Sequence, residues 1–182
     1  MPSINNSKSD IDELESHMRN FAPDAATIPS HLETTDFRIR MLKITDVVKD
    51  YDAVMSSVEH LRGVFGPKES WPEGLTLEQD LIDLGWHQKE FELRSSFAYT
   101  VMSLDESRCL GCVYVDPSEK MGYDAKVVLW VRQSETESGL DEALFSSVKN
   151  WLSEKWWFSL VAFPGRDFSW QHWESLPDKT SD

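Results

Sequence analysis

The sequence predicts a single mixed α/β domain with a mostly antiparallel, twisted sheet flanked by helices. Its 182 residues, 40% of them hydrophobic, are enough to build one core. Segments that alternate apolar and polar residues are interspersed with segments whose apolar residues recur at helical spacing. Their order is strand, helix, helix, strand, strand, strand, helix, strand and short helix. One strand and two helices, followed by an antiparallel run and a β-α-β unit, indicate a mixed sheet.

The compact domain is expected to span residues 36–176, with an N-terminal extension over 1–35 and a polar tail over 177–182. Ser9 can cap a short helix at the start of the extension. Pro23 and Pro29 break regularity, so the rest of the extension is interpreted as a linker. We expect the short helix to dock on its own domain. Docking on a second copy, which would give a homodimer, is the alternative.

Local sequence patterns predict the strands and helices of the first half of the domain. Residues 37–42 alternate and form the first strand, and Thr45 starts a helix that runs to Leu61. Residues 63–74 form a loop. Thr76 and Gln79 then make a capping box for a second helix. The residues of that helix expected to face the core are Leu77, Leu81, Leu84 and Phe91.

A hairpin and a central strand follow. Residues 96–104 and 109–115 are strands, and the polar turn 105–108 between them predicts a hairpin. Residues 125–133 are rich in β-branched side chains, which favours a central strand.

The last part of the chain predicts a helix, a strand and a short helix. The long helix covers 138–155, the strand 158–163 and the short aromatic helix 170–176. Spacing indicates a buried face on the long helix made of Leu140, Leu144, Val148, Trp151 and Leu152.

Charge and hydropathy exclude several classes of partner. The formal net charge is −14, which disfavours binding to nucleic acid and to anionic membrane surfaces. No apolar run approaches the ~20 residues of a membrane span. The first residues lack the basic and apolar regions of a secretory signal. We therefore expect a cytoplasmic protein with reduced cysteines.

The two cysteines form the spacing Cys109-x-x-Cys112 inside a predicted strand. Side chains alternate along a strand, so positions three apart are expected to face opposite sides of the sheet. The two thiols would then be buried as small hydrophobic groups. The sequence therefore predicts no metal site.

Three stretches carry a resemblance to a known family. The opening strand and turn are FRIRMLKITDV (37–47), the middle hairpin is FAYTVMSLDESRCLGCVYV (97–115), and the strand, loop and helix after it are VVLWVRQSETESGLDEALFSSVKNWL (127–152). Over roughly residues 36–165 the chain resembles the GNAT-type N-acetyltransferases. The resemblance implies a GNAT-like sheet that is short of the family's usual last strands, because little chain remains after Phe163.

The same resemblance implies acetyl-CoA as acyl donor. In this family the loop before the long helix carries Gln/Arg-x-x-Gly-x-Gly/Ala, and its backbone N–H groups hold the cofactor's pyrophosphate. Laid on this chain, the pattern falls on residues 136–141, where only Gly139 matches. The cofactor-binding residues implied are Val131, Arg132, Gln133, Ser138, Gly139, Leu140 and Arg166. For Arg166, a surface salt bridge is the alternative.

Acidic residues around this loop favour an interpretation other than cofactor binding. Two carboxylates of the first helical turn, Asp141 and Glu142, follow Gly139, and Glu135 and Glu137 precede it. A carboxylate ~6 Å from a phosphate charge costs roughly 3 kcal/mol at an effective dielectric constant near 20. The helix dipole offers only about 0.3–1 kcal/mol at an exposed site. The loop is therefore equally well explained as an ordinary acidic helix start.

The resemblance also implies catalytic roles. A carboxylate near the central strand would take the proton of the acceptor amine, with Asp124 the first candidate and Glu119 the second. The backbone N–H of Val131 would polarise the thioester carbonyl. The family's tyrosine acid has no counterpart, because no tyrosine follows Tyr123. Five tryptophans could wall an acceptor groove or belong to the core: Trp71, Trp86, Trp130, Trp157 and Trp170.

Two functions follow. The first is an acyl-CoA-dependent N-acyltransferase that acts on a small-molecule amine or another amino group, with the acidic surface favouring a cationic acceptor. The second is a catalytically inactive protein in which the same fold serves as a binding or dimerisation module.

Overall fold

The computed structural model describes residues 21–179 and contains one mixed sheet. Its six strands lie in chain order, β1-β2-β3-β4-β5-β6. Neighbouring strands are antiparallel from β1 to β5, and β6 is parallel to β5. The strands are β1 (His31–Glu33), β2 (Arg38–Met41), β3 (Phe97–Met102), β4 (Cys109–Pro117), β5 (Ala125–Val131) and β6 (Val161–Ala162). The predicted fold class is confirmed.

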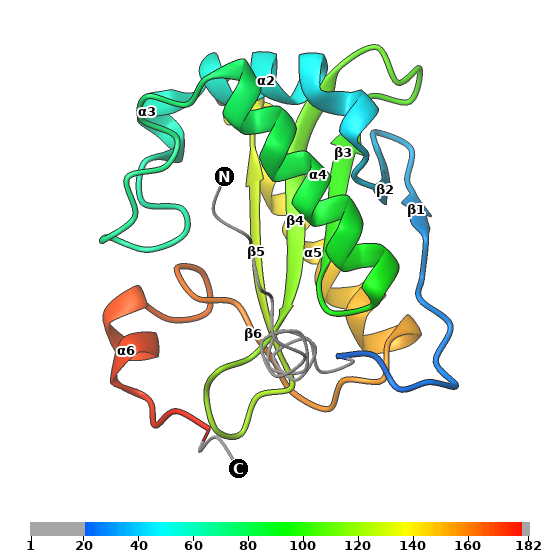
Figure 1. Cartoon of the computed structure of the whole chain (residues 1–182), viewed down its shortest axis with the longest axis vertical. Helices are drawn as coiled ribbons and strands as arrows, with labels where there is room; N and C mark the ends of the chain where they lie inside the picture. The colour runs from blue at the N-terminus through cyan, green and yellow to red at the C-terminus, as the bar shows by residue number, and fades with distance from the viewer. Residues whose placement is uncertain (1–20, 180–182) are drawn as a thin grey trace, which may run out of the picture.

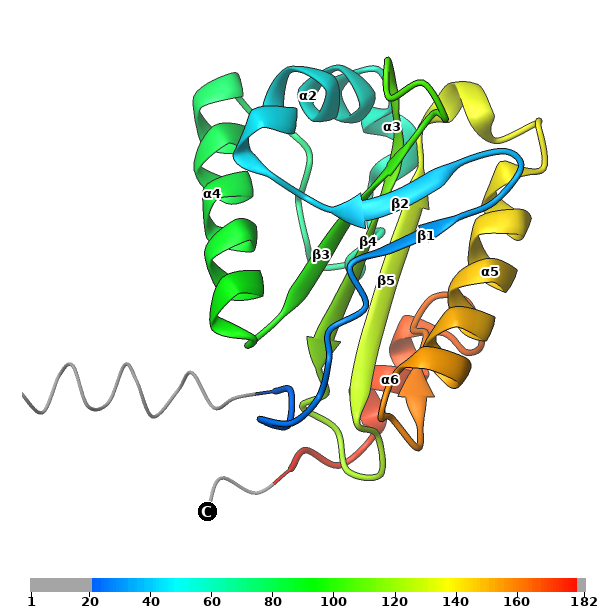
Figure 2. The ribbon, with the colours of Figure 1, turned by 90° about the vertical axis from the view of Figure 1, so that its right-hand side faces the viewer.

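Helices cover both faces of this sheet. Figure 2 shows α4 on one face and α5 on the other, with α2 across the end of the sheet. The α-helices are α2 (Val47–Met55), α3 (Val58–Leu61), α4 (Leu77–Leu93), α5 (Leu140–Lys155) and α6 (Trp170–Ser175). Two 3-10 turns, η1 (Ile44–Asp46) and η2 (Gln133–Glu135), precede α2 and follow β5. None of the helices within residues 21–179 is long and apolar enough to cross a membrane.

The two faces of the sheet bury separate cores because side chains alternate along β4 and β5. Val113, Val127 and Leu129 pack toward α5. Tyr114 and Trp130 pack toward α2 and α4. All five residues predicted for the buried face of α5 are buried: Leu140, Leu144, Val148, Trp151 and Leu152.

Several predicted elements differ in detail. The predicted linker contains β1, which pairs with β2, so the sheet begins before residue 36. The predicted helix from Thr45 to Leu61 is interrupted at Ser56 and Ser57. The predicted strand 158–163 is reduced to the two residues of β6. The predicted helix beginning near Ser9 lies outside the described residues.

The second helix begins as predicted, but part of its predicted inner face is exposed. Thr76 caps α4 and its side chain accepts a hydrogen bond from the Gln79 amide. Leu84 is buried, whereas Leu77 and Leu81 are 47% and 40% exposed. Figure 1 shows α4 running obliquely across the sheet, and the exposure of Leu77 and Leu81 shows that periodicity alone overestimates its buried face.

Candidate active site

A cleft opens where β5 and β6 separate. The two strands pair only at Ala125 with Val161 and at Lys126 with Ala162, and then diverge. A cavity of about 420 Å³ lies beyond this point. We call it the β5 cleft, and its wall is formed by residues 60–64, residues 127–130, Asp141, residues 164–166 and Trp170. In Figure 1 these segments are the end of α3, β5, the start of α5 and the chain between β6 and α6.

The open edge of β5 carries backbone groups without a strand partner, and Val131 follows directly after the β5 residues that line the cleft. The amide of Arg132 donates to the Leu110 carbonyl at 2.8 Å, so Arg132 and Leu110 form a hydrogen-bonded antiparallel pair. Val131 is opposite Gly111 and therefore occupies the next, non-hydrogen-bonded pair. The N–H of Val131 consequently points away from β4, toward the edge that β6 leaves open. This is the orientation needed for the predicted role in polarising a carbonyl.

Two amides at the start of α5 also lack an acceptor. Gly139 is the N-cap and has a positive φ of 81°, a left-handed conformation that favours glycine. The amide of Leu140 reaches the Ser138 hydroxyl at 3.3 Å, and that of Ala143 reaches the Gly139 carbonyl. Among the described residues, the amides of Asp141 and Glu142 have no acceptor. The predicted anion site at this helix N-terminus therefore keeps free donors.

The cations of the cleft are already paired with carboxylates. Arg166 donates to both oxygens of Asp141, at 2.9 and 2.6 Å, and to the Leu129 carbonyl at 3.3 Å. Its guanidinium thus spans from the first turn of α5 to the open edge of β5. Arg62 lies on the other wall and is paired with Glu59 and Glu73. An anionic ligand would have to compete with these carboxylates.

Two of the predicted cofactor residues, Arg132 and Gln133, are engaged in contacts with α2 and Ser57. Arg132 is buried and donates to Asp52, to the Ser56 hydroxyl and to the Cys109 carbonyl, so it ties β5 to α2. The amide of Gln133 donates to the Ser57 hydroxyl at 2.9 Å. Ser138, Gly139 and Leu140 surround the N-terminus of α5 as predicted.

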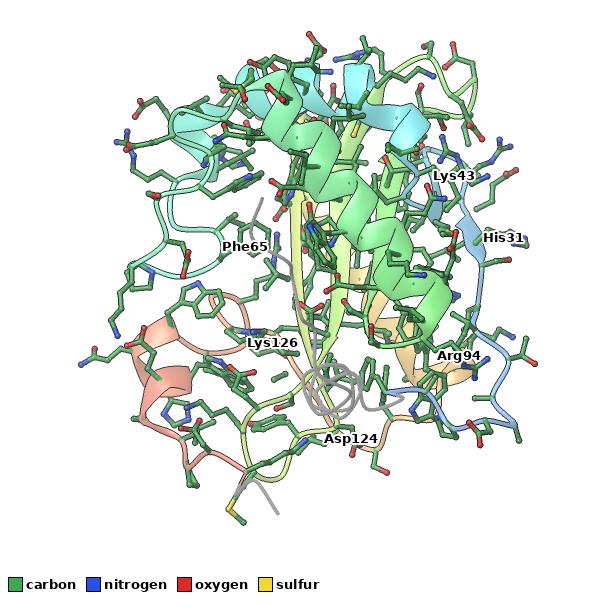
Figure 3. The ribbon with its side chains drawn as sticks, viewed as in Figure 1. His31, Lys43, Phe65, Arg94, Asp124 and Lys126 are labelled. Atoms are coloured by element: carbon green, nitrogen blue, oxygen red, sulfur yellow. The ribbon has the colours of Figure 1, made fainter. Side chains whose placement is uncertain are left out.

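Neither candidate base lines the β5 cleft. Asp124 Oδ2 accepts hydrogen bonds from the amides of Ser159, at 2.6 Å, and Leu160, at 2.9 Å. Figure 3 shows Asp124 at the lower end of the sheet, well below Phe65. Glu119 accepts from the Trp173 indole N–H at 3.1 Å and lies 3.5 Å from the Lys126 ammonium. Both carboxylates are held by structural partners, and their catalytic roles stay predictions.

One titratable side chain of the cleft wall, His60, was not identified from the sequence. His60, at the end of α3, is exposed and belongs to the cleft wall. A histidine can exchange a proton near neutral pH. No fixed spacing connects it to β5 in the sequence, and only the fold brings the two together.

The five tryptophans considered for an acceptor groove separate into three places. Trp130 and Trp170 line the β5 cleft. Trp71 and Trp86 line a second cavity, of about 390 Å³, between α2, α4 and β4. Trp157 packs in an aromatic cluster with Phe21 and other rings away from both cavities.

We call this second cavity the acidic pocket. Its wall consists of Asp50, Phe65, Glu69, Trp71, Asp80, Asp83, Leu84, Trp86, His87, Glu90 and Tyr114. Burial raises the pKa of Asp50 to about 6. Burial, reinforced by the neighbouring charge of Asp50, raises the pKa of Asp80 to about 7. The lining therefore contains two carboxyl groups whose charged forms are disfavoured mainly by burial.

The prediction that the two cysteines face opposite sides of the sheet is wrong. Cys112 and Cys109 both face Asp50, with sulfur-to-Oδ1 distances of 3.2 and 3.9 Å. The reason is a register shift, because Val101 pairs with Gly111 but Met102 pairs with Cys109. The resulting bulge adds a residue and returns Cys109 to the same face as Cys112. The donor atoms of Asp50, Cys109 and Cys112 lie within 4.8 Å of one another, so strand alternation does not exclude a shared metal.

A mostly antiparallel sheet with a parallel last strand that splays from the central strand defines the GNAT-type N-acetyltransferase fold. Solved structures with this fold resemble the chain. The ribosomal-protein-S5-alanine acetyltransferase from Vibrio fischeri has 18% identity and a TM-score of 0.56, over 68% of this chain and 67% of that one. The ribosomal L7/L12 α-N-protein acetyltransferase RimL, in complex with coenzyme A, has 12% identity and a TM-score of 0.56, over 68% of each chain.

A third similar structure is the microcin C7 self-immunity acetyltransferase MccE in complex with acetyl-CoA and AMP. It has 11% identity and a TM-score of 0.52, over 73% of each chain. No protein-family profile matches the sequence, and no curated protein matches it. At these identities the likeness establishes the fold, which agrees with the resemblance read from the sequence.

Proposed function

We propose that this protein is an acyl-CoA-dependent N-acyltransferase that binds its donor in the β5 cleft. One observation carries the proposal: β5 and β6 separate after a two-residue pairing, next to a helix N-terminus with free amides. Acetyl-CoA would supply an activated acyl thioester and a pyrophosphate. The free amides of Asp141 and Glu142 suit the pyrophosphate, and the N–H of Val131 suits a carbonyl oxygen.

Calorimetric titration with acetyl-CoA and with free coenzyme A tests this proposal. Ser138→Glu adds a negative charge beside the free amides and is expected to weaken cofactor binding roughly tenfold to a hundredfold, by Coulomb repulsion. Ser153→Glu is the matched control, because it adds the same charge near the other end of α5. Absence of binding to the unmodified protein at millimolar ligand would remove the proposal and leave the inactive binding module.

We assign the role of proton acceptor to His60 rather than to Asp124, because His60 lines the cleft and Asp124 does not. His60→Asn is expected to lower the rate of acyl transfer to an amine about a hundredfold. Its effect on coenzyme A affinity should be small. Release of the coenzyme A thiol measures the rate, and titration calorimetry measures the affinity. An unchanged rate would show that another group accepts the proton.

A further inference from the structure

The acidic pocket holds a buried carboxyl pair, and His87 is the only basic side chain among the described residues of its lining. Asp50 and Asp80 are 3% and 4% exposed. Asp50 accepts hydrogen bonds from the weakly donating thiols of Cys109 and Cys112, and a hydrogen bond between the Asp50 and Asp80 carboxyl groups also raises the pKa of Asp80. Asp80 Oδ2 is buried and has no hydrogen-bond partner. No lysine or arginine of residues 21–179 lines the pocket. Buried carboxylates are costly unless a positive charge or hydrogen bonds compensate them.

Aromatic rings form the walls around these carboxyl groups. The ring of Phe65 meets those of Trp71 and Tyr114 edge-on, at centroid distances of 5.0 and 5.2 Å. His87 lies 5.2 Å from Tyr114. Trp86 is 63% exposed and also belongs to the wall, so it stands at the rim of the pocket. Aromatic faces attract organic cations while tolerating their apolar carbon atoms.

We propose that the acidic pocket binds a small organic amine in its protonated form, with the ammonium beside the Asp50–Asp80 carboxyl pair, at the unpartnered Asp80 Oδ2, and its carbon chain against the tryptophan walls. The cation would supply the missing hydrogen-bond donors to Asp80 and neutralise the carboxyl pair. Further carboxylates, Glu69, Asp83 and Glu90, also belong to the lining and favour a diamine over a monoamine. A metal ion would use the carboxylates but not the apolar walls.

The location of the pocket beside the β5 cleft favours a role for the bound amine as the acyl acceptor. Trp71 of the acidic pocket packs on Trp130 of the β5 cleft, with ring centroids 6.1 Å apart. The linings of the two cavities are therefore in contact at this pair of rings. Identification of the bound amine as the acyl acceptor rests on the proposed function, whereas its binding does not. A diamine could keep one end beside the Asp50–Asp80 carboxyl pair and extend the other toward the cleft.

Binding is measured with 1,4-diaminobutane, n-butylamine and the neutral 1-butanol, in the absence of any coenzyme A. Tryptophan fluorescence and calorimetry report occupancy, because Trp71 and Trp86 line the site. We expect diaminobutane to bind more tightly than butylamine, and butanol not to bind. Asp80→Asn should weaken diaminobutane binding roughly tenfold or more, since a charge-assisted hydrogen bond is lost. The same variant should raise the melting temperature of the ligand-free protein at pH 8, because an uncompensated carboxylate is removed.

Two further variants keep the test decisive. Glu92→Gln removes the same charge from α4 outside the pocket and should leave binding unchanged. Trp86→Leu alters an exposed side chain, so the protein should fold, and it should weaken binding. Equal binding of all three probes, or equal affinities of the Asp80→Asn and Glu92→Gln variants, would overturn the proposal. Amine binding without acetyl-CoA binding would overturn only the proposed function, and the reverse result would overturn only this inference.

Discussion

Gly111→Ala is expected to destabilise the protein by about 3 kcal/mol, at the upper end of overpacking effects. A β-carbon at this position would lie 2.0 Å from the Trp130 carbonyl oxygen and 3.0 Å from the Val131 α-carbon. Both contacts are with backbone atoms of β5, so no rotation of a side chain can relieve them. The strands must separate, and the cleft edge of β5 moves with them. Such a loss is a large share of the roughly 5–15 kcal/mol that stabilises a typical domain.

The matched control is Gly85→Ala, the same chemical change in α4. Its β-carbon would meet only the Ile44 δ1 carbon, at 3.7 Å, which is an ordinary contact. Alanine favours a helix over glycine by roughly 0.5–1 kcal/mol, so this variant should be more stable than the parent. Urea denaturation of both variants gives the two free energies of unfolding. A Gly111→Ala protein that unfolds at the parent's urea concentration would show that β4 and β5 do not approach this closely.

Regular periodicity explains why much of the fold could be predicted. The apolar positions of α5 recur at helical spacing, and all five predicted members of its buried face are buried. Thr76 and Gln79 supply their own local hydrogen bonds, so the start of α4 was predictable from four residues. The polar turn between β3 and β4 predicted the hairpin for the same reason. Each of these features is encoded within a short stretch of chain.

Features that depend on distant residues could not be predicted in this way. The bulge that turns Cys109 toward Asp50 arises from the pairing of β4 with β3, and strand alternation alone gives the opposite answer. Asp50, Asp80 and Tyr114 meet in the acidic pocket without any common spacing in the sequence. The partners of Asp124 are also distant, because its carboxylate accepts hydrogen bonds from two amides of the loop before β6, a contact that no local sequence pattern predicts.

Asp141→Asn is expected to strengthen the binding of coenzyme A roughly tenfold or more, which is the second large effect. The variant removes a negative charge from the first turn of α5, where a charge ~6 Å from a phosphate is worth roughly 3 kcal/mol at a dielectric constant near 20. It also releases Arg166, whose guanidinium is held by both Asp141 oxygens. Arg166 could then donate to a phosphate from within the cleft. Titration calorimetry at low and high salt measures the gain, which should shrink as salt screens it.

Glu142→Gln distinguishes the loss of charge repulsion from the release of Arg166. Glu142 lies in the same helical turn as Asp141 but holds no described cation. General repulsion predicts equal gains for the two variants, whereas release of Arg166 predicts a larger gain for Asp141→Asn. Arg166→Ala in the Asp141→Asn background should then remove the additional gain, because the freed guanidinium is absent. If Asp141→Asn instead weakens binding, the ion pair positions Arg166 for the ligand rather than withholding it. The pair would then be part of the cofactor site, and the acidic start of α5 would no longer argue against catalysis.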